Sequence, residues 1–245
     1  MPSRRNVWGI DHFSGHDYLK VMDQNSINKS FILPLDGLFF DYEICNNELF
    51  QWCAAAPERL IPWFTFEPRS ATALKEIDRC VLEYGMAGVK LHPWLQGFRP
   101  TEDCMLPLAS RLQELNIPIV FHDGTPPYST PLQIAELAKL FPDLKVILGH
   151  GGLYDMVDEA IVATNEYPNV YISMTSLPTG YMKRIIENVD SSQLLFGSDG
   201  GLTNLDKESY VGTRWKMFRS LDLTGEQFAQ ICETNPTNLI NGTRP

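Results

Sequence analysis

Eight short runs rich in β-branched and aromatic residues constrain the fold of this chain more than any other feature. Between them lie segments with apolar residues at helical spacing, such as 71–85, 105–116 and 131–141. Continuous apolar strands that alternate with amphipathic helices indicate a parallel sheet covered on both faces. Successive runs start between 23 and 31 residues apart, and they occupy residues 6–11, 29–35, 60–66, 87–92, 117–122, 144–150, 169–174 and 193–199.

Eight such units in 245 residues predict a (β/α)₈ TIM barrel, an α/β fold, formed as a single domain over residues 1–245. A doubly wound open sheet is the alternative. It is disfavoured because "GIDHFSG", after the first run, lacks the G-x-G-x-x-G phosphate-binding spacing. Gly85 and Asn116 stand where helix C-caps belong, and Pro131 stands where a helix could begin. Residues 200–224 are expected to form a loop and a helix over the barrel mouth.

Composition limits the class of partner. The formal net charge of −10 argues against nucleic acid or an anionic membrane surface. No stretch approaches the roughly 18 apolar residues of a membrane span. The five cysteines are scattered without a C-x-x-C pair, which is typical of reduced thiols. We therefore expect a cytoplasmic protein that acts on a small molecule.

The histidines of the chain gather where a barrel places its chemistry. Active sites of this fold lie at the C-terminal ends of the strands. His12, His92, His122 and His150 all stand at such ends, and His16 follows the first of them by four residues. Carboxylates stand there too, including Asp123 and Asp199. Imidazole and carboxylate converging on one opening are the ligands that Zn²⁺ or Mn²⁺ requires.

Four motifs carry a family resemblance. They are "GVKLHPWLQGF" (88–98), "IPIVFHDGTPP" (117–127), "VILGHGG" (146–152) and "LLFGSD" (194–199), and "ETNPTNLI" follows near the C-terminus. In order and spacing they resemble the amidohydrolase-related family (amidohydrolase 2 type) of the metal-dependent hydrolase superfamily. The resemblance runs from about the second strand to the end of the chain.

The resemblance implies roles for individual residues. His122 would be a metal ligand, and Asp199 would both bind the metal and act as general base toward water. His150 would bind metal or polarise the substrate. One divalent ion, zinc or alternatively manganese, would be bound. Apart from the resemblance, the positions of four further residues at or near the strand ends predict contact with the substrate, and they are Lys90, His92, Trp94 and Asp123.

The first strand departs from the family pattern. The family begins with D-x-H-x-H, whereas alignment on Asp11 places Phe13 and Gly15 at the two ligand positions. His12 and His16 would be the displaced pair. Four residues of extended strand span about 13 Å, too far for two ligands of one metal unless the chain turns after Phe13. An irregular metal site, a weakened site and a metal-free site all remain open.

Three classes of function follow. The first is hydrolysis of a C–N or C–O bond in a small carboxylated or cyclic substrate, with Asp199 as base; non-oxidative decarboxylation of an aromatic or unsaturated acid uses the same residues. The second is a metal-independent, lactonase-like hydrolysis. The third is a binding protein without catalysis, disfavoured because buried polar groups without a function cost desolvation energy. A homodimer is compatible with the exposed aromatic residues.

Overall fold

The computed structural model describes residues 15–39, 41–200 and 210–241. Within them, seven strands coincide with seven of the eight predicted runs, and the remaining run, residues 6–11, lies outside the described residues. The strands are β1 (Ser30–Ile32), β2 (Leu60–Pro62), β3 (Val89–Leu91), β4 (Ile119–Phe121), β5 (Val146–Leu148), β6 (Val170–Ser173) and β7 (Leu194–Leu195).

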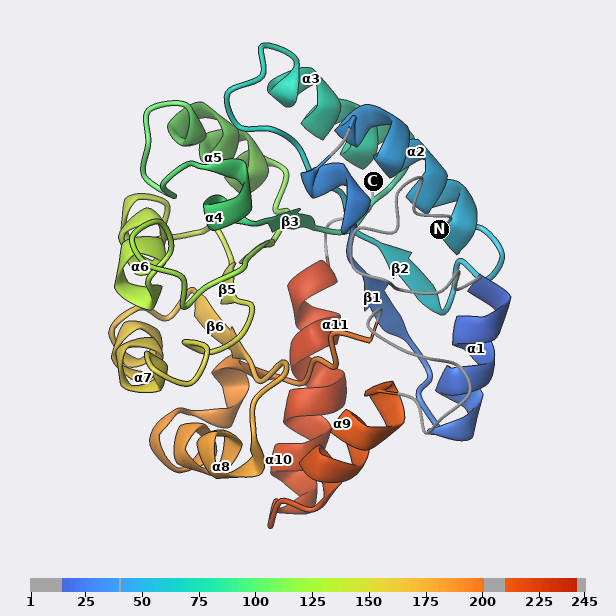
Figure 1. Cartoon of the computed structure of the whole chain (residues 1–245), viewed down its shortest axis with the longest axis vertical. Coiled ribbons are helices and arrows are strands. Elements are labelled where there is room, and N and C mark those ends of the chain that lie inside the picture. The colour runs from blue at the N-terminus through green and yellow to red at the C-terminus, as the bar shows by residue number, and fades with distance from the viewer. Residues whose placement is uncertain (1–14, 40, 201–209, 242–245) are drawn as a thin grey trace.

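The described strands pair in parallel and in chain order. β1 pairs with β2, an isolated parallel bridge joins Phe64 to Val89, and β3 to β7 follow as one sheet. A doubly wound sheet reverses its strand order at a switch point, and the described strands contain no such reversal. Figure 1 shows helices arranged around the outside of the strands. The prediction of a TIM-barrel-type fold is confirmed.

Helices connect the strands as the sequence pattern predicts. The helix expected over 131–141 begins at Pro131, where Thr130 and Gln133 form a capping box. Gly85 and Asn116 end their helices with positive φ values of 62° and 55°. The helices are α1 (Gly15–Gln24), α2 (Tyr42–Cys53), α3 (Ala73–Asp78), α4 (Pro93–Gln96), α5 (Met105–Glu114), α6 (Pro131–Leu140), α7 (Val157–Glu166), α8 (Thr179–Asn188), α9 (Tyr210–Arg219), α10 (Gly225–Ala229) and α11 (Asn235–Ile240).

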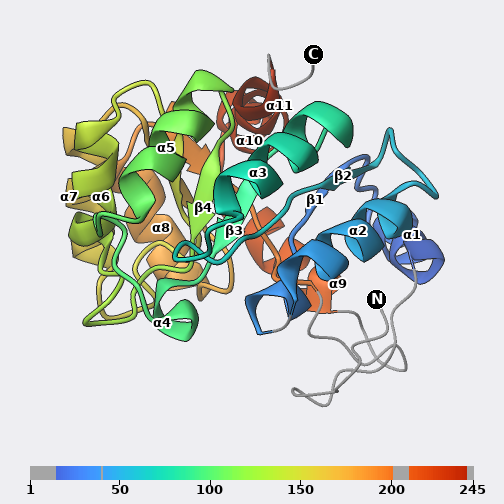
Figure 2. The ribbon, with the colours of Figure 1, turned by 90° about the horizontal axis from the view of Figure 1, so that it is seen from above.

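Side chains of the strands alternate between two apolar layers. In β4, Ile119 and Phe121 pack outward against the helices, whereas Val120 belongs to the inner layer. That inner layer also contains Leu239 of α11. Lys145 Nζ donates hydrogen bonds to the carbonyls of Asn238 and Leu239, both at 3.2 Å. In Figure 2, α11 and α4 lie on opposite sides of the barrel. Because α4 directly follows the C-terminal end of β3, α11 covers the other end of the barrel, and the face with the strand ends is left to the functional site.

None of the described helices is both long and apolar enough to span a lipid bilayer. The helix expected within 200–224 is α9, and residues 201–209 lie outside the described residues.

Candidate active site

The ends of β3, β4 and β5 bring three histidines together. Lys90 pairs with Val120 in the register of β3 and β4, so His92 and His122 follow at the same level. Their rings stack with centroids 3.8 Å apart and an interplanar angle of 11°. His150 meets His122 edge-on, with centroids 4.3 Å apart. The strand-end histidines within the described residues therefore form one cluster at the C-terminal end of the barrel.

Asp123 is fully buried and organises the turn that carries His150. Its Oδ1 accepts a hydrogen bond from the backbone N–H of His150 (2.5 Å), and its Oδ2 accepts one from Gly152 (2.6 Å). Burial raises the pKa of Asp123 to about 6, although these two bonds act in the opposite direction. Gly152 has a φ of 91°, and a Cβ there would lie 2.2 Å from the Met156 carbonyl oxygen, so this turn requires glycine. The Asp123 carboxylate, which we expected to contact substrate, faces the backbone of a neighbouring loop.

The three imidazoles are held in their neutral forms. Burial, and then the positive charge of Lys90, lower the pKa of His150 to about 3. The pKa of His92 is also about 3, because of burial and then repulsion from Lys90 and His150. Burial, followed by repulsion from His150, Lys90 and His92, holds the pKa of His122 far below its ordinary value. At neutral pH the cluster therefore carries no charge of its own.

The hydrogen bonds of His92 and His150 differ. The Leu95 N–H donates to His92 Nδ1 at 3.5 Å, so in the neutral ring the proton lies on Nε2, which is left as a donor. His150 Nδ1 is buried and has no hydrogen-bond partner among the described residues. A buried polar atom without a partner is unusual and is compatible with a group that contacts substrate.

Lys90 supplies the buried cation of the site. Its side chain is only 9% exposed and lies on the inner face of β3, opposite Val120. Burial lowers its pKa to about 8, while the negative charges of Asp199 and Asp123 raise it. At neutral pH most molecules therefore hold an ammonium group beside three neutral rings.

Asp199 follows β7 and contacts residues that the strand-end pattern does not include. Its Oδ2 accepts a hydrogen bond from Ser176 Oγ at 3.4 Å. Ser176 Oγ lies 3.3 Å from the Tyr210 hydroxyl, and Arg214 Nη2 donates to that hydroxyl at 2.7 Å. Sequence reasoning missed Ser176, which stands in the loop just after β6 and beyond the predicted run 169–174, and Tyr210 and Arg214, which stand on α9. The only signal was the polar, aromatic character of residues 200–224.

Of the other predicted site residues, two are exposed and one lies outside the described residues. Trp94, on α4, is 53% exposed, and His16 is exposed on the first turn of α1. His12 lies outside the described residues. In the ranges 15–39, 41–200 and 210–241, no group of three or more His, Cys, Asp or Glu side chains could hold a metal ion. The described residues alone therefore do not provide the ligand set of a divalent metal.

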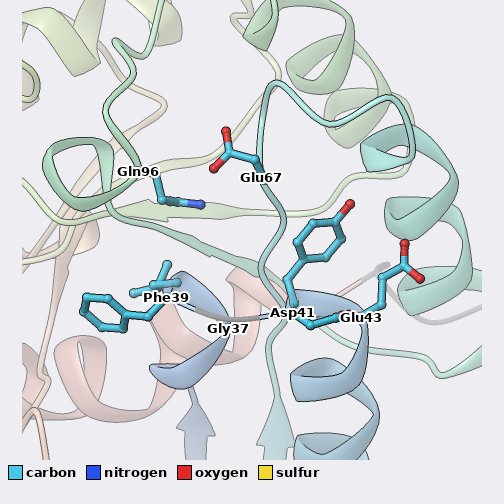
Figure 3. Close-up of a pocket in the computed structure, with 8 residues that line it drawn as sticks. Gly37, Phe39, Asp41, Glu43, Glu67 and Gln96 are labelled. Carbon is cyan, nitrogen blue, oxygen red and sulfur yellow. The ribbon is translucent and has the colours of Figure 1, made fainter. Parts of the chain in front are cut away.

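A separate acidic pocket of about 490 Å³ lies near the cluster. Figure 3 shows Glu67 and Gln96 on one side of it and Phe39 across from them. Gln96 links the two regions, because its Oε1 accepts a hydrogen bond from the His92 N–H at 2.9 Å. Glu43 also lines this pocket. The carboxylates of Glu43 and Glu67 make the pocket less suited to an anion than the surroundings of Lys90.

A family model described as amidohydrolase matches residues 39–241, which include every described residue of the histidine cluster. The chain belongs to the amidohydrolase family. This confirms the resemblance seen in the four sequence motifs. A comparison with curated proteins finds no match.

Solved structures of similar fold include members with different chemistry. An uncharacterised TIM-barrel protein from Bordetella bronchiseptica has a TM-score of 0.76 at 18% identity, covering 93% of this amidohydrolase chain and 83% of the other. A 4-oxalomesaconate hydratase from Rhodopseudomonas palustris has a TM-score of 0.72 at 19% identity (98% and 87% covered). A dihydroxybenzoic acid decarboxylase from Polaromonas, with bound manganese and the inhibitor 2-nitroresorcinol, has a TM-score of 0.70 at 18% identity (93% and 86% covered). At these identities the likeness establishes the fold alone.

Proposed function

We propose that this amidohydrolase-family protein is an enzyme that hydrolyses a C–N or C–O bond in a small carboxylated or cyclic substrate. The observation that supports this most directly is Lys90, a buried ammonium group beside neutral imidazoles. A buried cation surrounded by neutral donors binds a carboxylate or a developing oxyanion strongly, because little water competes for it.

Asp199, His92 and His150 have the remaining roles in this reaction. Asp199 accepts a proton from water while the water oxygen attacks the scissile carbonyl carbon. The Nε2–H of His92 stabilises the oxyanion that forms. Neutral His150, whose ring N–H is held by the Thr175 backbone, offers its other nitrogen, Nδ1, as an acceptor to the substrate. When the intermediate collapses, the leaving nitrogen or oxygen takes the proton back from Asp199.

Decarboxylation is the second candidate, favoured by the similar fold of the dihydroxybenzoic acid decarboxylase. In this reaction Asp199 starts protonated. The C–C bond to the carboxylate breaks, CO₂ leaves, and Asp199 delivers its proton to the carbon that carried the carboxylate, after which solvent reprotonates Asp199. A substrate carboxylate beside Lys90 is common to both reactions. They differ in the bond that breaks and in the role of Asp199, which is a base toward water in hydrolysis and an acid in decarboxylation.

A substrate panel separates the candidates. The full chain is assayed with lactones, N-acyl compounds and hydroxylated benzoic acids, with ring opening, acid release and CO₂ release measured separately. We expect Asp199→Asn to lower kcat by roughly 100-fold or more, and Lys90→Met to raise KM for carboxylated substrates. Full activity in Asp199→Asn would refute the role of Asp199 in either reaction.

The steps above use no metal, because the described residues do not form a complete ligand set. A divalent ion held by His122 and Asp199 would need further ligands, and His12 and His16 are the candidates that the sequence offers. Our prediction of about one zinc or manganese ion per chain is tested by elemental analysis of protein purified without chelators, as wild type and as His12→Ala. A wild-type protein with far less than one ion per chain would contradict it.

A further inference from the structure

We propose that Tyr210 and Arg214 are positioning residues that fix the Asp199 carboxylate through Ser176. The inference rests on the proposed role of Asp199 as the group that exchanges protons with the substrate. It adds three residues, from the β6–α8 loop and from α9, to a site otherwise built from strand ends. The four side chains form one continuous line of hydrogen bonds.

The chemistry of the groups gives this line a single direction. A guanidinium has only donors, so Arg214 must donate to the Tyr210 oxygen. A carboxylate has only acceptors, so the Ser176 hydroxyl hydrogen is committed to Asp199 Oδ2. The Ser176 oxygen must then accept the hydrogen of Tyr210. Every donor points toward Asp199, and a cation stands at the far end.

The backbone beneath the line is held in a conformation that needs support. Ser176 and Asp199 have φ values of 63° and 58°, in the left-handed region that disfavours residues with a side chain. The Tyr154 hydroxyl donates to the Ser176 carbonyl at 3.3 Å, and Arg214 Nη1 donates to the Leu177 carbonyl at 3.4 Å. Backbone strain that neighbouring contacts maintain is typical of functional sites.

Helix α9 carries the two donors, Tyr210 and Arg214, and packing holds this helix in place. Tyr210 and Arg214 are four residues apart, on one face of the helix, and the guanidinium carbon lies 4.8 Å from the centre of the Tyr210 ring. Further along α9, the ring of Phe218 packs 4.7 Å from Phe196, three residues before Asp199. The same aromatic contact therefore ties α9 to the segment that presents the carboxylate.

The line determines which oxygen of Asp199 reacts. Ser176 donates to Oδ2, which lowers the basicity of that oxygen, so we assign proton transfer to Oδ1. Without the Tyr210 hydroxyl, Ser176 is free to rotate, and the carboxylate loses the contact that fixes its orientation. A small misplacement of a reacting group is enough to lower a catalytic rate strongly.

Two substitutions remove the line in different ways. Tyr210→Phe deletes only the hydroxyl and keeps a ring beneath Arg214. Ser176→Gly deletes the hydroxyl but relieves the unfavourable backbone conformation, so it separates the hydrogen bond from the strain. Tyr167→Phe is the matched control, because Tyr167 ends α7 just before the start of β6, at the other end of the barrel.

The first measurement needs no substrate. Crystal structures should show one Asp199 side-chain conformer in wild type and in Tyr167→Phe, and more than one in Tyr210→Phe and Ser176→Gly. If both of those variants keep the single wild-type conformer of Asp199, the proposal is overturned. This result is independent of the proposed reaction, which fails separately if wild type turns over nothing in the substrate panel.

The second measurement uses any substrate that wild type turns over. We expect Tyr210→Phe and Ser176→Gly each to lower kcat by roughly tenfold to a hundredfold, with KM changed less than about twofold. The double variant should be no worse than either single variant, because both break the same line. A merely structural role predicts instead that Ser176→Gly, which relieves strain, has wild-type kcat, and that result would overturn the proposal.

Discussion

Replacing Lys90 by methionine should stabilise the protein at neutral pH while damaging its site. Burial lowers the pKa of Lys90 from its ordinary 10.5 to about 8. At about 1.4 kcal/mol per pKa unit, holding the ammonium form in the folded state costs about 3 kcal/mol below pH 8. Methionine fills a similar volume without a charge, so Lys90→Met removes that cost. Part of the gain is lost, because Asp123 and Asp199 lose a nearby cation.

The sign of the pH dependence follows from proton binding. Between about pH 8 and pH 10.5 the unfolded chain still holds the lysine proton, whereas the folded chain has released it. The unfolded state therefore binds more protons, and the stability of wild type rises with pH in this window. Lys90→Met has no such group. Between pH 7 and pH 10, wild type should gain about 2–3 kcal/mol in its free energy of unfolding relative to the variant.

Urea unfolding at both pH values, followed by circular dichroism, measures this difference. The titration of other groups is common to both proteins and cancels when the two are compared. Lys139→Met, at an exposed position on α6, is the matched control and should follow wild type. Parallel pH profiles for wild type and Lys90→Met would refute the reasoning, because they would mean that the pKa of Lys90 is not lowered by folding.

Three further tests, with four substitutions, concern the packing of the barrel. Glu76, only 2% exposed, accepts hydrogen bonds from Arg79 at 2.7 and 2.8 Å. Arg79→Met should lower the free energy of unfolding, measured in urea, by about 3–5 kcal/mol because it leaves a buried carboxylate unpaired. Adding Glu76→Met should recover much of that loss. Gly88→Ala would place a Cβ 2.4 Å from the Trp63 ring. This substitution should lower the free energy of unfolding by about 1–3 kcal/mol and shift the tryptophan fluorescence. Asp123→Asn replaces an acceptor by a donor opposite a backbone N–H. The free energy of unfolding should fall by about 1–3 kcal/mol. An unchanged unfolding midpoint in urea would contradict this prediction.

The barrel could be predicted because its signal repeats along the chain. Seven strands lie within the runs that the sequence marked, and helices fill the intervals between them. The position of the site followed from the same repeat, because all parallel strands present their C-terminal ends on one face. His92, His122 and His150 are in contact because their strands are neighbours in register.

Contacts between loops and helices could not be predicted in the same way. Ser176, Tyr210 and Arg214 come from segments with no fixed register, and their meeting depends on how α9 packs against Phe196. No periodic pattern encodes such a contact. The structure was needed to place these side chains beside Asp199.

The alternation of side chains along a strand explains the different placements of His122 and Asp123. Adjacent residues of a strand point to opposite faces, so when His122 follows Val120 onto the inner face, Asp123 must leave it. Its carboxylate then meets the backbone N–H groups of His150 and Gly152. One dipeptide thus supplies a group for the site and an anchor for the next loop. The chain therefore ends this buried strand with two ionisable residues that have different tasks. His122 belongs to the site, and Asp123 holds the loop that carries His150, the neighbour of His122.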